Sequence, residues 1–130
     1  MRFPITHEPD ILLSRQSGKQ LAQELGFSVV EATMIATAIS EVARNILLYA
    51  GSGEVVIERS QSEGRSGLRV IARDDGPGIA DVDRAMEDGY STGRGLGLGL
   101  PGARRLMDEL DLASTPGQGT TVTMSRWVRR

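Results

Sequence analysis

Glycine is unevenly distributed along this chain of 130 residues, and its distribution restricts the fold more than any other feature. Half of the sixteen glycines lie between Gly76 and Gly102. Collagen has glycine at every third position and low-complexity chains repeat a short unit, and this segment follows neither pattern. Because glycine lacks a Cβ atom, the segment predicts a place where the backbone approaches another group closely.

The composition predicts one soluble globular domain that spans residues 1–130. The chain is 39% hydrophobic and 25% charged, and its length allows a hydrophobic core. It has no apolar run near the roughly 18–20 residues of a membrane helix, and it begins without the apolar stretch of a signal peptide. With a net charge of −2, we expect a cytoplasmic protein that binds neither membrane nor nucleic acid.

Several kinds of chemistry are excluded by the residues that the chain lacks. It has no cysteine, and therefore neither a disulfide nor a thiolate that binds metal or attacks a substrate. The single histidine, His7, cannot form a histidine metal cluster, and no motif around it suggests a Ser-His-Asp triad. The single lysine, Lys19, is followed by glutamine, so no phosphate loop ends in Gly-Lys-Ser/Thr.

The hydrophobic periodicity predicts elements in the order β-α-α-β-β-α-β-β. The expected ranges are 2–6, 10–25, 28–50, 54–60, 67–74, a helix from near 101 to 110, 111–115 and 119–128. A short helix at 80–87 and a mobile loop at 88–95 are also expected. Strands paired in hairpins and helices grouped together are typical of an α/β two-layer sandwich, with a mixed, mostly antiparallel sheet and the helices on one face.

The helix predicted at 28–50 begins at a capping box formed by Ser28 and Glu31, and Gly26 is placed to end the helix before it. Its apolar stripe is expected to face the core, with polar residues on the opposite side. The stripe consists of Ile35, Ile39, Val42, Ile46 and Tyr49, and the polar residues are Thr33, Thr37, Ser40 and Arg44. In the later helix, the core stripe consists of Ala103, Leu106, Met107 and Leu110.

Glu41 and Asn45 are four residues apart and are therefore neighbours on one face of the helix at 28–50, at the border of its apolar stripe. The amide oxygen of an asparagine suits Mg²⁺, which takes few protein ligands and keeps several waters. The carboxylate can act as a general base. The alternative is an ordinary polar pair at the boundary of a helix face.

Residues 74–79, with the sequence DDGPGI, follow a predicted strand. An aspartate at a strand end that faces a cavity can accept a hydrogen bond from an exocyclic amine, and such a buried contact discriminates strongly between ligands. The two glycines of this segment allow positive φ angles and close approach of the backbone. The alternative is a plain turn of the Asp-Gly and Pro-Gly kind.

Residues 93–102, GRGLGLGLPG, lead into the start of a helix, where unpaired backbone amides favour phosphate. Residues 97–102 match the dinucleotide pattern G-x-G-x-x-G, but no strand precedes them, so the dinucleotide interpretation fails. The segment is not the glycine-rich loop of protein kinases either, because neither a strand that carries a lysine nor a catalytic-loop motif follows it. The remaining alternative is a flexible hinge.

Gly119-Thr120, taken alone, indicates only the start of a strand.

In this order, the four blocks resemble the GHKL nucleotide-binding family, which includes gyrase, Hsp90, MutL and histidine kinases. The blocks are Glu41 with Asn45, Asp74-x-Gly76-x-Gly78, Gly95 to Gly99, and Gly119-Thr120. Within the family the chain is similar to the small anti-sigma-factor serine kinases, and above all to the switch kinases of the stressosome. That closer similarity rests on residues 37–51, 74–79, 86–92 and 95–110, and it covers nearly the whole chain.

The resemblance implies the Bergerat α/β sandwich, with ATP and Mg²⁺ as its ligands. Asp74 would bind the adenine amino group, assisted by Thr120, and Gly78 would lie against the base. Asn45 would hold Mg²⁺, and Glu41 would orient or deprotonate the attacking hydroxyl. The implied nucleotide-binding residues are Asn45, Asp74, Gly76, Gly78, Ile79, Gly93, Arg94, Gly95, Leu96, Gly97, Leu98, Gly99 and Thr120, of which Gly95 to Gly99 would wrap the phosphates.

The resemblance also implies protein partners. The phosphorylated group would be a serine of a STAS-domain protein, and the kinase, once released, would bind and activate a PPM-type phosphatase. The nearer alternative is an anti-sigma-factor kinase whose partner is a sigma factor, and another is a non-catalytic module whose nucleotide gates partner choice. A histidine-kinase fragment is disfavoured, because His7 precedes the first helix.

Two residues depart from the family pattern. Arg94 stands inside the glycine-rich segment, where it reaches either the γ-phosphate or solvent. Asp75 adds a second carboxylate beside Asp74 that the motif does not need, and we assign it no role.

Overall fold

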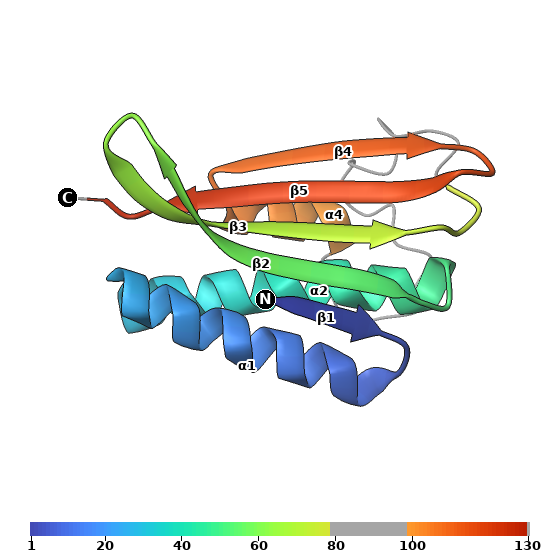
Figure 1. Cartoon of the computed structure of the whole chain (residues 1–130), viewed down its shortest axis with the longest axis horizontal. Helices are drawn as coiled ribbons and strands as arrows, with labels where there is room; N and C mark the ends of the chain where they lie inside the picture. Colours follow the sequence, from blue (N-terminus) through green and yellow to red (C-terminus); the bar gives the residue numbers. More distant parts are fainter. Residues whose placement is uncertain (79–98, 130) are drawn as a thin grey trace.

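The computed structural model describes residues 1–78 and 99–129, which form a layer of strands and a layer of helices (Figure 1). The elements are β1 (Arg2–Ile5), α1 (Glu8–Leu25), α2 (Val29–Tyr49), β2 (Gly53–Ser62), β3 (Arg65–Asp74), α4 (Gly99–Leu106), β4 (Glu109–Thr115) and β5 (Gly119–Trp127). This is the order that the sequence predicted. The short helix expected at 80–87 and the mobile loop expected at 88–95 lie outside the described residues.

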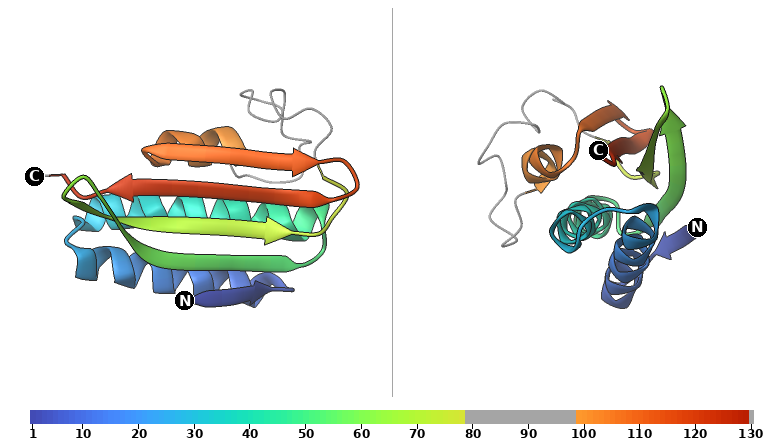
Figure 2. Two further views of the ribbon diagram at one scale, coloured as in Figure 1. Left: turned by 45° about the horizontal axis from the view of Figure 1, so that its top comes forward. Right: turned by 90° about the vertical axis from the view of Figure 1, so that its left-hand side faces the viewer.

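The sheet has five strands in the order β1-β2-β3-β5-β4. Each of its four pairings is antiparallel, so the described strands form a more regular sheet than the mixed, mostly antiparallel one that we expected. The helices α1, α2 and α4 all lie on one face of the sheet (Figure 2). The predicted two-layer α/β sandwich is therefore confirmed.

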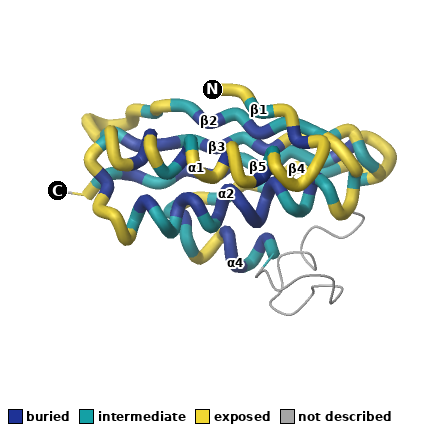
Figure 3. The backbone as a smooth tube through the Cα atoms, turned by 90° about the horizontal axis from the view of Figure 1, so that it is seen from below, coloured by how far each residue is buried: buried dark blue, intermediate teal, exposed yellow. Residues whose placement is uncertain are grey.

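The helix α2 is central, because α1 and α4 flank it and the sheet covers it (Figure 2). Six consecutive residues of α2, from Ala38 to Ala43, are buried (Figure 3). Ser40, which we expected on the polar face, is among them, and its hydroxyl donates to the Ala36 carbonyl at 3.1 Å. The expectation for Ser40 was wrong, because periodicity reveals one apolar face and cannot reveal that further elements pack around the helix.

The N-terminus of α2 is closed by the predicted capping box. The Ser28 hydroxyl accepts from the Glu31 N–H at 3.1 Å, and the Glu31 carboxylate accepts from the Ser28 N–H at 3.3 Å. The hydrogen bond from the Ser28 backbone is the main cause that holds the pKa of Glu31 below its ordinary value. Arg126 of β5 contacts Glu31 at 3.4 Å and donates to the Leu106 carbonyl at 2.8 Å. One side chain thus joins α2, α4 and the sheet.

The third long helix is shorter than the sequence predicted. It ends at Leu106, and Leu110 lies in β4, from which it packs against the core. Asp108 accounts for the break, because its N–H donates to the Ser125 carbonyl at 2.9 Å and its carboxylate accepts from the Trp127 N–H at 2.8 Å. The spacing of Leu110 was misleading, because apolar residues of a short helix and of the strand after it fell at helical intervals.

Candidate functional site

The helix-facing side of the sheet changes from apolar to polar toward one end. Two apolar rows cross β3, β5 and β4 in register: Val70–Met124–Leu110 and Ala72–Val122–Leu112. The next row, which we call the polar row, consists of Asp74, Thr120 and Ser114. The hydrophobic core therefore ends at a place where three strands bring three polar side chains together.

Hydrogen bonds orient the polar row. Asp74 Oδ1 accepts from the Gly76 N–H at 2.9 Å, and Oδ2 has no hydrogen-bond partner among the described residues. Ser114 Oγ donates to the Gly119 carbonyl at 3.1 Å and lies 2.9 Å from Thr120 Oγ1. Asp74 and Thr120 were predicted as site residues, whereas Ser114 was missed. The alternation of side chains along β4, combined with the hairpin register, is the signal that points to Ser114.

The loop 75–78 packs between α2 and the β4–β5 hairpin, and its glycines make this possible. A Cβ at Gly76 would lie 2.5 Å from the Cβ of Ala50, which caps α2. Gly78 has a φ of +78° and leaves no room for a Cβ beside the Thr115 carbonyl. Both glycines are therefore needed for contacts within the chain itself, and these contacts hold the polar row beside the C-terminal end of α2.

Gly119 provides a test of this close packing. Its φ is +93°, and a Cβ there would collide with the Asp74 carbonyl. We expect Gly119→Ala to lower the free energy of unfolding by roughly 2–6 kcal/mol, since backbone strain and overpacking each cost about 1–3 kcal/mol. The matched control is Gly117→Ala, where φ is +81° and no atom lies within 4 Å of the Cβ position. Urea unfolding measures both, and equal losses would contradict the collision.

Glu41 of α2 is buried, with an exposed fraction of 7%, and both carboxylate oxygens face hydrogen-bond donors. Oε2 accepts from the Gly99 N–H at 3.0 Å, and Oε1 lies 3.5 Å from Nη1 of Arg44. Gly99 is the first residue of α4, so the carboxylate lies at a helix N-terminus, where a negative charge is stabilised. Arg44, which we expected opposite the apolar stripe, is thus a partner of Glu41. Their i, i+3 spacing is the signal for this pair.

Asn45 is half-buried and lies one turn of α2 beyond Glu41. Measured along the helix from Ala50, Asn45 is about 8 Å away and Glu41 about 14 Å away, at about 1.5 Å per residue. The helix thus leads from the polar row to an amide oxygen and then to a buried carboxylate.

Asn45 offers an amide oxygen, which is a hard ligand of the kind that Mg²⁺ accepts. Among the described residues, no three His, Cys, Asp or Glu side chains gather into a metal-binding group. A Mg²⁺ ion fits Asn45, because Mg²⁺ keeps several waters and takes one or two protein oxygens together with the oxygens of a bound phosphate ligand.

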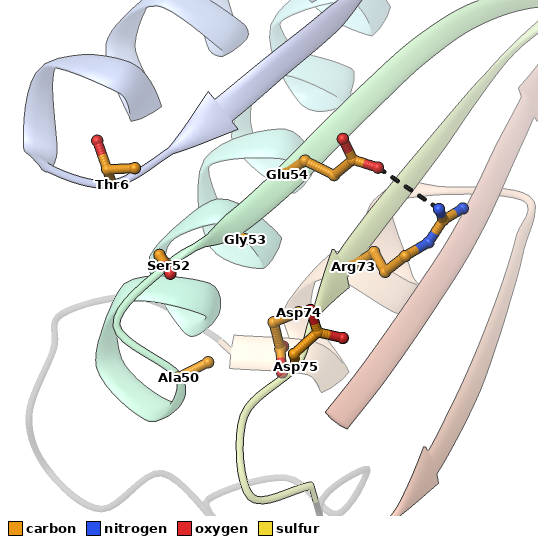
Figure 4. A pocket seen from close by; sticks show the side chains of 8 residues that line it. All are labelled: Thr6, Ala50, Ser52, Gly53, Glu54, Arg73, Asp74 and Asp75. Atoms are coloured by element: carbon orange, nitrogen blue, oxygen red, sulfur yellow. Dashed lines mark hydrogen bonds and ion pairs between the residues drawn. The ribbon is translucent and has the colours of Figure 1, made fainter. Parts of the chain in front are cut away.

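A hollow of about 410 Å³ opens beside the polar row, on the side of β1 and β2 (Figure 4). Its walls are formed by Thr6, Ala50, Ser52, Gly53, Glu54, Arg73, Asp74 and Asp75. Glu54 and Arg73 form an ion pair of 3.4 Å at its rim. Because Thr120 and Gly76 are not among its walls, the hollow adjoins the polar row rather than enclosing it.

The predicted site residues fall into three groups. Seven lie outside the described part of the chain: Ile79, Gly93, Arg94, Gly95, Leu96, Gly97 and Leu98. Four lie together at the end of the sheet: Asp74, Gly76, Gly78 and Thr120. The other three, Glu41, Asn45 and Gly99, lie on α2 and at the start of α4. The second and third groups are joined by α2, which carries Glu41 and Asn45 and ends at Ala50 beside Gly76.

A two-layer sandwich with such a site defines a class of nucleotide-binding domains. Residues 30–129 match the family model described as histidine kinase-, DNA gyrase B-, and HSP90-like ATPase. The chain belongs to this family, and the resemblance inferred from its four motifs is thereby confirmed.

The chain is similar to serine/threonine-protein kinase RsbT of Bacillus subtilis (strain 168), with 53% identity over 125 residues, 96% of this chain and 94% of RsbT. It is 33% identical to the anti-sigma F factor of Caldanaerobacter subterraneus, over 84% of this chain and 79% of that protein. The enzyme class expected from the sequence, an ATP-dependent protein-serine/threonine kinase, is confirmed by the similarity to RsbT and by the family model.

The fold also matches a solved structure, the histidine kinase domain of the blue-light activated histidine kinase EL346 from Erythrobacter litoralis, with a TM-score of 0.53. The match covers 91% of this chain and 59% of that chain, and at 24% identity it supports the fold alone. No helix among the described residues combines the length and the apolar character that crossing a membrane requires.

Proposed function

We propose that this protein is a cytoplasmic Mg²⁺-ATP-dependent kinase that phosphorylates a serine of a STAS-domain protein. Once released from this substrate, it binds and activates a PPM-type phosphatase in a stress-signalling switch. The observation that carries the proposal is the pairing of Glu41 with Asn45 on α2, next to the N-terminus of α4. Nucleotide binding alone needs only Asn45. Transfer of phosphate to a hydroxyl is also accelerated by a general base, which Glu41 can provide. The 53% identity with RsbT supports this activity.

The site residues have separate tasks in this proposal. Asp74 and Thr120 would receive the adenine, and Asn45 would hold Mg²⁺, which would supply positive charge to the phosphates. Residues 95–99 wrap the phosphates with backbone N–H groups, which a Cβ would keep at a distance. Because the single lysine, Lys19, lies in α1, the phosphate charge is met by Mg²⁺, by arginine and by these N–H groups. Positioning and charge stabilisation account for most of the catalysis of phosphoryl transfer.

Glu41 is the proposed base. It takes the proton of the serine hydroxyl as the serine oxygen bonds to the γ-phosphorus, and the bond from this phosphorus to the β–γ bridging oxygen breaks to release ADP. The Glu41 carboxylate has about four acceptor sites, and two of them now face Gly99 at 3.0 Å and Arg44 at 3.5 Å. The longer contact with Arg44 is the weaker one. The Gly99 contact thus couples the base to the segment that wraps the phosphates.

Incubation with labelled ATP and a STAS-domain protein of the source organism tests the proposal. We expect label on a serine of the STAS-domain protein with the wild-type kinase, and at least about 100-fold slower labelling with Glu41→Ala. A direct measurement of ATP binding accompanies both reactions. Bound ATP without label on the STAS-domain protein would contradict the kinase proposal and favour the module whose nucleotide only gates partner choice.

The alternative is an anti-sigma-factor kinase, which the 33% identity with an anti-sigma F factor favours. The proposed switch kinase and the anti-sigma-factor kinase use the same fold and site, so their protein partners distinguish them. A pull-down from the source cell in ATP and in ADP, followed by mapping of phosphorylated residues, identifies this partner. Recovery of a sigma factor without any STAS-domain protein would overturn the proposed switch role.

The position of His7 does not support a histidine kinase, because His7 precedes α1 and its ring contacts Asp10 at 2.9 Å.

A further inference from the structure

The polar row contains a hydroxyl pair whose hydrogen-bond directions follow from the geometry. Ser114 Oγ donates its one hydrogen to the Gly119 carbonyl at 3.1 Å. Ser114 Oγ and Thr120 Oγ1 are 2.9 Å apart, so a hydrogen bond joins them. Because a hydroxyl has a single hydrogen, Ser114 cannot also donate to Thr120. Thr120 must therefore donate to Ser114.

This direction leaves the Thr120 hydroxyl as an acceptor toward the site. Its hydrogen points to Ser114, and only lone pairs remain for a ligand. Asp74, its neighbour across the β3–β5 register, is also an acceptor, because Oδ1 already accepts from Gly76 and Oδ2 has no partner among the described residues. The end of the sheet thus presents two acceptors side by side.

We propose that Ser114 determines the base specificity of the site by holding the Thr120 hydroxyl as an acceptor. An amino group at position 6 of a purine has two N–H donors and matches Asp74 and Thr120, directly or through one water. A 6-oxo purine places an oxygen lone pair against the same two acceptors, which leaves buried polar groups unpaired and is strongly disfavoured. Ser114 is thus a positioning residue that acts through Thr120. This inference rests on the proposed function, because it assumes that a purine nucleotide occupies the site.

Equilibrium binding of ATP and of inosine triphosphate tests the inference, because these nucleotides differ at position 6 of the purine. We expect wild-type protein to prefer ATP by at least about 100-fold. In Ser114→Ala the Thr120 hydroxyl loses its acceptor and turns to donate to the 6-oxo group. We therefore expect the ratio of the two Kd values to fall by about tenfold, the equivalent of one hydrogen bond.

Matched variants separate positioning from general damage to the sheet. Ser114→Thr keeps the hydroxyl and should retain the wild-type Kd ratio. Thr121→Ala removes a hydroxyl from the neighbouring residue of β5, on the other face of the sheet, and should also retain it. If Ser114→Ala does not fold, Ser114→Cys replaces it, because a thiol is nearly isosteric and a poor acceptor.

The outcomes distinguish this inference from the proposed function. A lowered ratio in Ser114→Ala or Ser114→Cys, restored in Ser114→Thr, supports the role of Ser114. An unchanged ratio in the alanine and cysteine variants overturns it, and so does wild-type protein that binds both nucleotides equally, while the kinase proposal stands in both cases. Wild-type protein that binds no ATP overturns the proposed function together with this inference.

Discussion

Glu41→Gln is expected to slow phosphoryl transfer by about 10²–10⁴-fold and to leave the affinity for ATP nearly unchanged. Glutamine has almost the shape of glutamate, and its amide oxygen can still accept from the Gly99 N–H, which lies 3.0 Å from the present carboxylate. The start of α4 therefore keeps its contact, while the proposed base is lost. Single-turnover transfer to the STAS-domain protein measures the rate, and titration with ATP measures the affinity.

The matched control for Glu41→Gln is Glu58→Gln. Glu58 is a half-exposed glutamate of β2 whose ion-pair partner Arg69 lies 3.8 Å away, and the exposed pair contributes little to stability. Transfer by the Glu58 variant should therefore match the wild type. A Glu41→Gln protein that transfers phosphate at the wild-type rate would show that another group accepts the proton.

Asp74→Asn is expected to weaken ATP binding by at least about 100-fold, because a buried polar contact to the base is replaced by a mismatch. The asparagine oxygen can still accept from the Gly76 N–H, which now bonds Oδ1 at 2.9 Å. Its amide nitrogen then takes the place of Oδ2 and presents N–H donors where, in our proposal, the adenine amine needs an acceptor. Isothermal titration with ATP gives the affinity.

Asp75→Asn is the matched control for this second substitution. Asp75 is the next residue, is exposed, and lies at the rim of the hollow beside the polar row (Figure 4). The substitution removes the same charge one residue further along the chain, so a nonspecific electrostatic effect would appear in both variants. Equal losses of ATP affinity would contradict a direct contact between Asp74 and the base.

Local sequence patterns predicted the features that depend on near neighbours in the chain. The capping box of Ser28 and Glu31 and the left-handed Gly26 were found as expected, because both need only residues three or four apart. The spacing of Glu41 and Asn45 placed them correctly on one helix. The order of strands and helices also followed from periodicity and from turn residues.

Local patterns failed where distant segments determine the outcome. Leu110 has helical spacing yet belongs to β4, because Asp108 is bound by Ser125 and Trp127 of β5. Ser40 is buried although its side of α2 looked polar, because the helix is covered from several directions. Neither contact could be read from neighbouring residues.

The sequence by itself determined the family, the two-layer fold and the two residues on α2 that we assign to metal binding and proton transfer. The tertiary structure alone decided that the Glu41 side chain contacts Gly99 at the start of α4 and that Ser114 forms a hydrogen bond with Thr120. The physical reason is distance along the chain. Helix spacing is set by bonds between near neighbours, whereas a contact between residues 41 and 99, or the alignment of three strands in one polar row, is set by how the whole chain packs.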